Sequence, residues 1–323
     1  MNNKVSVVIP AYNEEETLGV LFGRLFPVLD SLGRPYEVIF VNDGSRDASL
    51  AMLLAEKARR AGLGQPQGAS QPQEGDNSFK ILDLGGNFGQ HMAIMAGFQH
   101  ATGDAVVTLD ADLQNPPEEI PRIVKLIDEG HDVVGTIRVD RRDSLFRKVA
   151  SRAVNRITNR ITGLALHDYG CMLRGYRRDI IDIINEAGEA ATFIPALAQK
   201  FASNPTEIAV AHSERGGGTS KYGLLRLIRL NFDLMTGFSL APLQAVTMAG
   251  LLISALSFLF AAFMLVRRLL VGPEAEGVFT LLALLFLLTG VTILCVGIEG
   301  EYVGRIYQEV RKRPRYVVRK VYE

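Results

Sequence analysis

The 323-residue sequence has two cysteines, no tryptophan and no excess of charge of either sign. Cys171 and Cys295 lie far apart and do not suggest a disulfide framework, which favours a reducing compartment. A formal net charge of zero argues against a nucleic-acid-binding protein that depends on a positive field. Residues 4–10 are typical of a short strand and not of the charged and apolar start of a signal peptide. We therefore expect the main domain to be cytosolic.

Strand-like and helix-like segments alternate along the first part of the chain, which is the pattern of a mostly parallel sheet covered by helices. This pattern predicts an α/β, Rossmann-like domain over residues 1–213. Gly, Gln, Pro and Ser are frequent in residues 62–77, which predicts a surface loop. The predicted strands are 4–9, 36–42, 79–84, 105–110 and 132–137, and the predicted helices are 15–32, 49–61, 90–101 and 117–129.

Two carboxylates one residue apart, Asp110 and Asp112, end the fourth predicted strand. Side chains at i and i+2 of a strand point to the same side, so both can converge on one point. The carboxyl ends of the strands are also where open α/β sheets bind ligands. Because carboxylate oxygens suit Mg²⁺ or Mn²⁺, we predict a metal and diphosphate site here. Two exposed loop aspartates without a ligand are the alternative.

Three further turns are predicted at the same edge of the sheet. The first offers the ring of Tyr12 for stacking, and Asp43 in the second can accept hydrogen bonds from a base or ribose. The third, residues 85–91, is Gly-rich at a helix N-terminus, which suits an anion or tight packing. It lacks the Gly-Lys-Ser/Thr of a P-loop, and His91 is expected to be a first-turn helix residue and not a ligand. Ordinary turn and capping chemistry is the alternative for all three.

Cationic residues follow the fifth predicted strand in residues 138–148 and recur in residues 214–222. A diphosphate leaving group or a phosphorylated partner needs such charge, although a solvated face is the commoner explanation. Leucines and arginines alternate by face in residues 224–230, as in an interfacial helix. We therefore predict an interfacial amphipathic segment over residues 214–233.

Two uncharged apolar runs, residues 234–266 and 277–298, each exceed the ~20 residues that cross a bilayer. They predict a two-helix transmembrane hairpin within residues 234–300, with helices at about 240–266 and 277–298; a buried helix pair in a soluble domain is the alternative. Residues 301–323 are predicted as a basic tail, since from residue 305 seven Lys or Arg stand against two Glu. The positive-inside rule then places both termini in the cytosol.

Taken together, these motifs resemble family-2 glycosyltransferases of the polyprenyl-phosphate sugar transferase group, over nearly the whole chain. A narrower resemblance is to the transferases of 4-deoxy-4-formamido-L-arabinose, which serve lipid A modification and polymyxin resistance; residues 62–77 depart from that pattern. The broader resemblance is carried by residues 7–15, 42–45, 110–114, Arg215 with 220–222, and 300–305 with 313–316, and the narrower one by residues 89–91, 114–121 and 168–174.

The resemblance implies a GT-A fold, a UDP-sugar donor, Mg²⁺ or Mn²⁺, an undecaprenyl phosphate acceptor at the bacterial inner membrane, and inversion at the anomeric carbon. It also implies a homo-oligomer, because close relatives are tetramers. Asp110 and Asp112 become catalytic candidates, with Asp168 at most orienting groups, since a phosphate monoester near neutral pH is already a nucleophilic dianion. By position, the resemblance assigns the nucleotide to Pro10, Tyr12, Glu14, Asp43, Asp110 and Ala111, the metal to Asp110, Asp112 and Gln114, and the lipid phosphate to Arg138, Arg147, Arg215, Ser220 and Lys221.

Three alternatives differ from this function. A glucose or N-acetylglucosamine transferase acting on the same lipid would differ only in pocket residues. A processive polysaccharide synthase would be similar to proteins carrying Gln-x-x-Arg-Trp, which a chain without tryptophan cannot match. A non-catalytic membrane scaffold that retains the fold would bind UDP without turnover.

Overall fold

The computed structural model describes residues 3–63, 77–138, 171–187, 193–210, 241–271, 277–310 and 314–323. These residues fall into two compact units. The first unit contains the described residues up to residue 210 together with the C-terminal residues from 314 onward, and the second contains two long helices.

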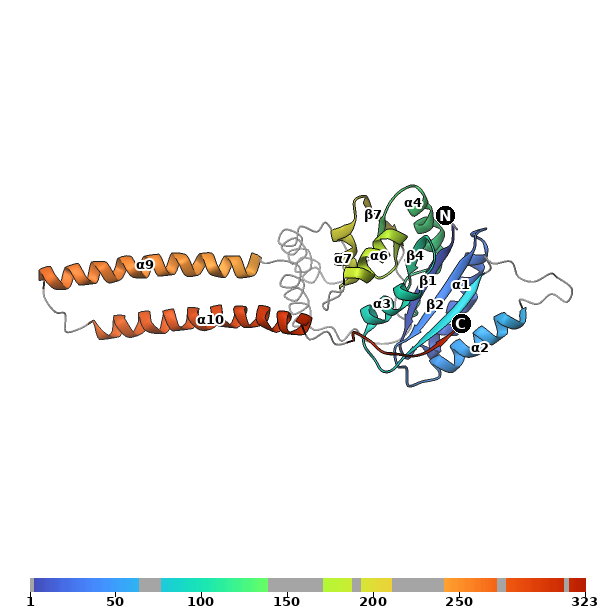
Figure 1. Cartoon of the computed structure of the whole chain (residues 1–323), viewed down its shortest axis with the longest axis horizontal. Coiled ribbons are helices and arrows are strands. Elements are labelled where there is room, and N and C mark those ends of the chain that lie inside the picture. Colours follow the sequence, from blue (N-terminus) through green and yellow to red (C-terminus); the bar gives the residue numbers. More distant parts are fainter. Residues whose placement is uncertain are drawn as a thin grey trace. The chain divides into compact units, whose positions relative to one another are not determined.

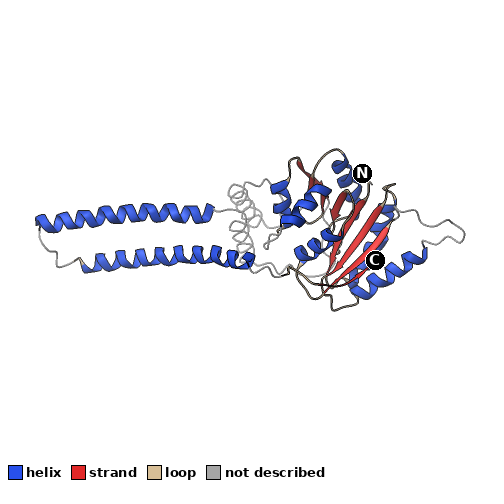
Figure 2. Ribbon diagram, viewed as in Figure 1, coloured by secondary structure: helices blue, strands red, loops and turns tan. Residues whose placement is uncertain are grey.

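The described part of the first unit is built on one eight-stranded sheet, in the order β7-β5-β6-β4-β1-β2-β3-β8 (Figure 2). All of its strands run in one direction except β6 and β8, which are antiparallel to their neighbours. This arrangement confirms the mostly parallel sheet, and it aligns the carboxyl ends of β1 to β5 along one edge. The strands are β1 (Val5–Ala11), β2 (Tyr36–Asn42), β3 (Ser78–Leu84), β4 (Ala105–Thr108), β5 (Val133–Arg138), β6 (Arg174–Arg177), β7 (Pro205–Val210) and β8 (Val318–Tyr322).

Helices cover both faces of this sheet. On one face, the apolar stripe of α1 packs against the sheet through aromatic contacts of Phe22 with Phe40 and of Phe26 with Phe79. On the other face, α3 lies so close to β1 that a Cβ atom at Gly97 would stand 2.2 Å from Val8 Cγ1. The first face carries α1 (Glu15–Asp30), α2 (Ser49–Leu63) and α4 (Ile120–Asp128), which follows the short 3-10 helix η1 (Pro117–Glu119), and the second carries α3 (Gln90–His100), α6 (Arg178–Ala187) and α7 (Ile194–Phe201).

The C-terminal residues differ from the sequence prediction. Residues 301–323, predicted as a basic tail, contain the end of α10, and residues 318–322 form the edge strand β8. Strand β8 pairs antiparallel with β3, so that Val318 lies opposite Leu84 and Tyr322 lies opposite Ile81. The chain therefore ends within the sheet with which it begins, as the N and C labels of Figure 1 show.

The described part of the second unit consists of α9 (Ala241–Val271) and α10 (Val278–Val310), which lie side by side (Figure 1). Large apolar side chains are exposed along both helices, among them Phe258 and Phe286. Within the described residues, one helix is long and apolar enough to cross a membrane, at Leu284–Gly304, and the apolar stretch Val246–Phe260 of α9 is shorter. The two helices overlap the segments predicted for the hairpin, and their crossing of a membrane stays a prediction.

Candidate active site

The acidic loop begins directly after β4, where Leu109 N donates a hydrogen bond to Val8 O at 3.1 Å. The next turn is closed by Asp112, whose Oδ1 accepts the backbone N–H of Gln114 at 3.1 Å. Between these residues Leu113 has a φ of 60°, a left-handed conformation that costs free energy for a leucine. Such strain is kept only where surrounding contacts fix it, so the loop holds Asp112 in a defined, partly exposed position.

Two amide side chains orient the other carboxylate, Asp110. Gln90 Nε2, from the first turn of α3, donates to Asp110 Oδ1, and Asn115 Nδ2 lies 3.4 Å from Asp110 Oδ2. Asn115 is buried, and its Oδ1 accepts a hydrogen bond from Cys171 Sγ at 3.4 Å. The sequence analysis did not identify Gln90 or Asn115 as site residues, although both stand in the motifs that carry the narrower resemblance. Asp110 is therefore positioned by α3 and by the loop itself.

The second turn is locked to the third by Asp43. Its carboxylate is buried and accepts the backbone N–H groups of Phe88 at 2.7 Å and of Gly89 at 2.9 Å. Burial raises the pKa of Asp43, and these two hydrogen bonds partly oppose that shift. Beside it, Gly44 has a φ of 70°, and a Cβ atom there would stand 2.6 Å from the carbonyl carbon of Gly86. The turn chemistry considered as an alternative is thus present, and nucleotide binding by Asp43 stays a prediction.

The first turn, after β1, presents Tyr12 with 41% of its surface exposed, and stacking of its ring on a base stays a prediction. Asn13 ties this turn to the second one, since its backbone N–H donates to Ser45 Oγ at 3.0 Å and its Oδ1 accepts Arg46 N at 2.8 Å. Glu14 N donates to Ser49 Oγ at 2.8 Å. Pro10, near the end of β1, and Ala111, between Asp110 and Asp112, are both buried. The predicted nucleotide residues therefore lie on connected turns at the carboxyl edge.

His91 packs in the first turn of α3, as expected, with its ring 5.1 Å from the ring of Phe193 in a T-shaped contact. Burial, aided by the positive charge of Arg174, lowers the pKa of His91 to about 4. The imidazole is consequently neutral near pH 7.

The predicted metal ligands are hard oxygen donors, two carboxylates and the amide of Gln114. Among the described residues there is no group of three or more His, Cys, Asp or Glu that could hold a metal ion by itself. A two-carboxylate set nevertheless fits Mg²⁺ or Mn²⁺, because such ions commonly take one or two protein carboxylates and complete their shell with substrate phosphates and water. Asp110, Asp112 and Gln114 thus fit a metal that arrives with a nucleoside diphosphate.

Most of the predicted phosphate contacts cannot be placed. Arg138 is the last residue of β5, so its backbone lies at the same edge as the acidic loop. Arg147, Asp168, Arg215, Ser220 and Lys221 lie outside the described residues.

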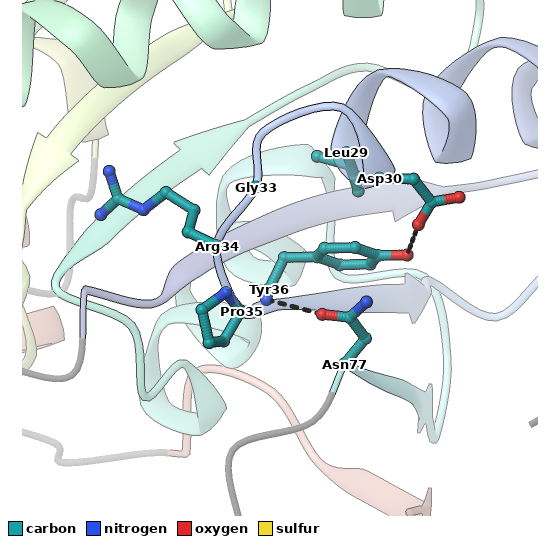
Figure 3. Close-up of a pocket in the computed structure, with 7 residues that line it drawn as sticks. All are labelled: Leu29, Asp30, Gly33, Arg34, Pro35, Tyr36 and Asn77. Carbon is teal, nitrogen blue, oxygen red and sulfur yellow. Dashed lines mark hydrogen bonds between the residues drawn. The ribbon is translucent and has the colours of Figure 1, made fainter.

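A cavity of about 310 Å³ opens elsewhere, at the amino ends of the strands (Figure 3). In it, Tyr36 donates its hydroxyl to Asp30 Oδ1 at 2.5 Å and its backbone N–H to Asn77 Oδ1 at 3.0 Å. Tyr36 begins β2, whereas the acidic loop follows the end of β4, so this cavity is on the opposite edge from Asp110 and Asp112. The candidate site is therefore assigned from the chemistry of the loop.

A mostly parallel Rossmann-like sheet with helices on both faces and an Asp-x-Asp loop at its carboxyl edge is the GT-A fold of nucleotide-sugar-dependent glycosyltransferases. The family model described as glycosyl transferase family 2 matches residues 6–184. The chain belongs to glycosyltransferase family 2, and it is an enzyme of that class.

Two relatives with the same name match nearly the whole chain. The chain is 49% identical to the undecaprenyl-phosphate 4-deoxy-4-formamido-L-arabinose transferase of Edwardsiella ictaluri, over 98% of this chain and 94% of the relative. It is 50% identical to the Klebsiella pneumoniae protein of the same name, over 98% and 93%. Among solved structures, glucosyl-3-phosphoglycerate synthase of Mycobacterium tuberculosis with Mn²⁺, UDP-glucose and phosphoglyceric acid is 17% identical, with a TM-score of 0.46 over 74% of this chain and 79% of that chain.

Proposed function

We propose that this protein transfers a sugar from a UDP-sugar to undecaprenyl phosphate at the cytosolic face of the bacterial inner membrane, and that the sugar is 4-deoxy-4-formamido-L-arabinose. The observation that carries the proposal is the identity of about half of all positions, over nearly the full length of both chains, with transferases of that name. The acidic loop at the carboxyl edge supplies the chemistry that such a transfer needs.

The donor is proposed to lie across the connected turns. Tyr12 stacks on the base, Pro10, Glu14, Asp43 and Ala111 hold the nucleoside, and Asp110, Asp112 and Gln114 hold the divalent ion. That ion would neutralise the charge that develops on the departing UDP. The hydrogen bonds from Gln90 and Asn115 keep the Asp110 carboxylate in place, so little reorganisation is needed when the leaving group separates.

The acceptor needs no general base, because a phosphate monoester has a second pKa of about 6 and is mostly a dianion at neutral pH. The work of the protein is then to hold two anions together. We assign acceptor binding to Arg138, Arg147, Arg215, Ser220 and Lys221, and an orienting role to Asp168. A single in-line displacement inverts the anomeric configuration, and NMR of the lipid product would reveal a retained configuration if a sugar–enzyme intermediate formed.

The pairing of β8 with β3 supports the membrane topology that we propose. Strands β1 to β7 precede the apolar helices and β8 follows them, yet all belong to one sheet. The chain between residues 210 and 318 must therefore cross a membrane an even number of times, if it crosses at all. If the α10 stretch Leu284–Gly304 spans the bilayer, we assign the second crossing to α9, which contains the shorter apolar stretch Val246–Phe260. We propose a hairpin with the sheet and both termini in the cytosol.

The deciding experiment incubates the purified full-length protein with undecaprenyl phosphate and a panel of UDP-sugars, with each lipid product identified by mass. The proposal expects product from UDP-4-deoxy-4-formamido-L-arabinose. Product formed only from UDP-glucose or UDP-N-acetylglucosamine would show that the transferred sugar is one of these. UDP binding without any product would indicate a non-catalytic scaffold. We also expect the detergent-solubilised protein to have the size of a homo-oligomer.

A further inference from the structure

The C-terminal segment touches the donor edge of the sheet, and the function proposed above gives it no role. Val317 directly precedes β8, and its carbonyl oxygen accepts a hydrogen bond from Gly85 N at 2.7 Å. Arg319 Nη2 donates a hydrogen bond to the carbonyl oxygen of the same glycine, Gly85, at 3.3 Å. Gly85 and Gly86 begin the third turn, the turn against which Gly44 is packed. The tail thus supports one of the turns that border the proposed nucleotide site.

A second contact from Arg319 leads to the other turns. Its Nη1 lies 3.7 Å from Asp83 Oδ2, and the same buried carboxylate accepts Asn42 Nδ2 through Oδ1 at 2.7 Å. Asn42 Oδ1 in turn accepts the backbone N–H of Ser45 at 3.3 Å. Ser45 Oγ holds Asn13 N, next to Tyr12. A continuous series of polar contacts therefore runs from β8 to the turns that would hold the base and ribose.

We propose that β8 is a positioning element for the donor nucleotide, and that Arg319 and Asp83 are the positioning residues through which it acts. Arg319 is 65% exposed, so its ion pair contributes little to overall stability. Its consequence is local, because Asp83 is buried and bonded to the residue before Asp43. Strand β8 is also the first element after α10, so the connection from the apolar helices ends on the donor turns.

This inference rests on the proposed function, because it assumes that UDP binds at the carboxyl edge. The test is titration of UDP with Mn²⁺ into the full-length protein in detergent, for wild type, Arg319→Gln and Lys320→Gln. Lys320 is the matched control, since its substitution removes the same charge from the adjacent position, where the ammonium lies 4.5 Å from the ring of Tyr322. We expect Arg319→Gln to weaken UDP binding by about fivefold or more, and Lys320→Gln to leave it unchanged.

Asp83→Asn gives an independent measurement. It keeps an oxygen that accepts from Asn42 but removes the charge that faces Arg319, so it should weaken UDP binding as Arg319→Gln does. Both changes break the Arg319–Asp83 contact, and Arg319→Gln also removes the contact to Gly85 O, so the double variant should be no weaker than Arg319→Gln alone. In steady-state assays the effect should appear in KM for the UDP-sugar, with KM for undecaprenyl phosphate and kcat unchanged.

Two failures are distinguishable. If the wild type does not bind UDP, the proposed function and this inference both fall. If the wild type binds UDP and Arg319→Gln behaves like Lys320→Gln, or if the KM values of donor and acceptor rise together, only the positioning role of β8 is refuted.

Discussion

At the amino-terminal edge of the sheet Glu37 is fully buried, whereas at the carboxyl edge Asp110 and Asp112 are partly exposed. Glu37 accepts Ser6 Oγ and Thr102 N, both at 2.5 Å, and lies 3.3 Å from the ammonium groups of both Lys4 and Lys80.

The surroundings of Glu37 lower the pKa of its carboxyl group. Burial alone would raise the pKa of Glu37, but the hydrogen bonds from Ser6 and Thr102, together with the two lysine charges, hold it at about 2. At the carboxyl edge the carboxylates accept hydrogen bonds from neutral amides, namely those of Gln90, Asn115 and Gln114. One edge thus buries its carboxylate between two lysines, which stabilises the fold, while the other presents two carboxylates at partly exposed positions.

The largest expected effect comes from Asp112→Asn. Loss of a metal ligand leaves the charge on departing UDP uncompensated, so turnover should fall by about 100-fold or more while the fold is kept. The measurement is product formation with donor and acceptor both saturating. Asp128→Asn is the control, because Asp128 is a half-exposed carboxylate at the amino edge, paired with Arg34. Near-normal turnover of Asp112→Asn would show that Asp112 is not a metal ligand of the active site.

Gly44→Ala should destabilise the donor turns. The alanine Cβ would stand 2.6 Å from the Gly86 carbonyl carbon at a φ of 70°, so we expect a loss of about 2 kcal/mol in the free energy of unfolding. Gly33 has a φ of 64°, and a Cβ atom added there would meet nothing within 4 Å, so Gly33→Ala costs only the backbone strain of about 1 kcal/mol. If thermal or denaturant unfolding shows equal losses of free energy for the two variants, the close approach of Gly44 to Gly86 does not contribute to the cost.

Glu37→Gln should cost about 2 kcal/mol of stability, because Lys4 and Lys80 then face an uncharged amide. In the wild type, the folded-state pKa of about 2 lies below the ordinary value of 4.5, so this stabilisation is present above pH 4.5 and is lost as the pH falls toward 2. Unfolding midpoints measured across that range should converge for wild type and variant at the acid end. KM for the donor should not change, and a changed KM would contradict the separation of the two edges.

Lys221→Ala is expected to have the smallest effect of the four. Removing one of several cations should raise KM for undecaprenyl phosphate by about tenfold and leave UDP affinity unaltered. Asp168→Asn provides a comparison, since an orienting residue should slow the reaction far less than the loss of Asp112. A rise in the donor KM with Lys221→Ala would instead place this lysine near the diphosphate.

The part of the fold with regular periodicity could be predicted from the sequence. Apolar runs such as Val38 to Val41 are buried on both faces, and β1 to β5 and α1 to α4 lie within a few residues of their predicted bounds. Strands β6 and β8 could not be predicted in this way. Strand β6 has an arginine at each end, and Arg174, which lies opposite Thr108 of β4, is fully buried in the folded sheet. Strand β8 carries Arg319 and Lys320, the charges that suit an edge strand and also suggest a solvated tail.

For the site, the sequence predicted the acidic loop because a strand ending in two carboxylates is a local pattern. The residues that orient it are distant in the chain, since Gln90 on α3 and Cys171 before β6 meet the loop only after folding. The hydrogen bonds of Asp43 could not be predicted either, because its partners Phe88 and Gly89 belong to another turn. Long-range hydrogen bonds thus set the geometry that local patterns leave open.

Binding of Mn²⁺ together with UDP tests most directly whether the carboxyl edge is the donor site. Electron paramagnetic resonance can follow Mn²⁺ titrated into the full-length protein with UDP, for wild type, Asp112→Asn and Asp128→Asn. We predict UDP-dependent Mn²⁺ binding by wild type and Asp128→Asn, and loss of that binding in Asp112→Asn. Equal UDP-dependent Mn²⁺ binding by all three proteins would contradict the assignment of the metal to the Asp110–Asp112 loop.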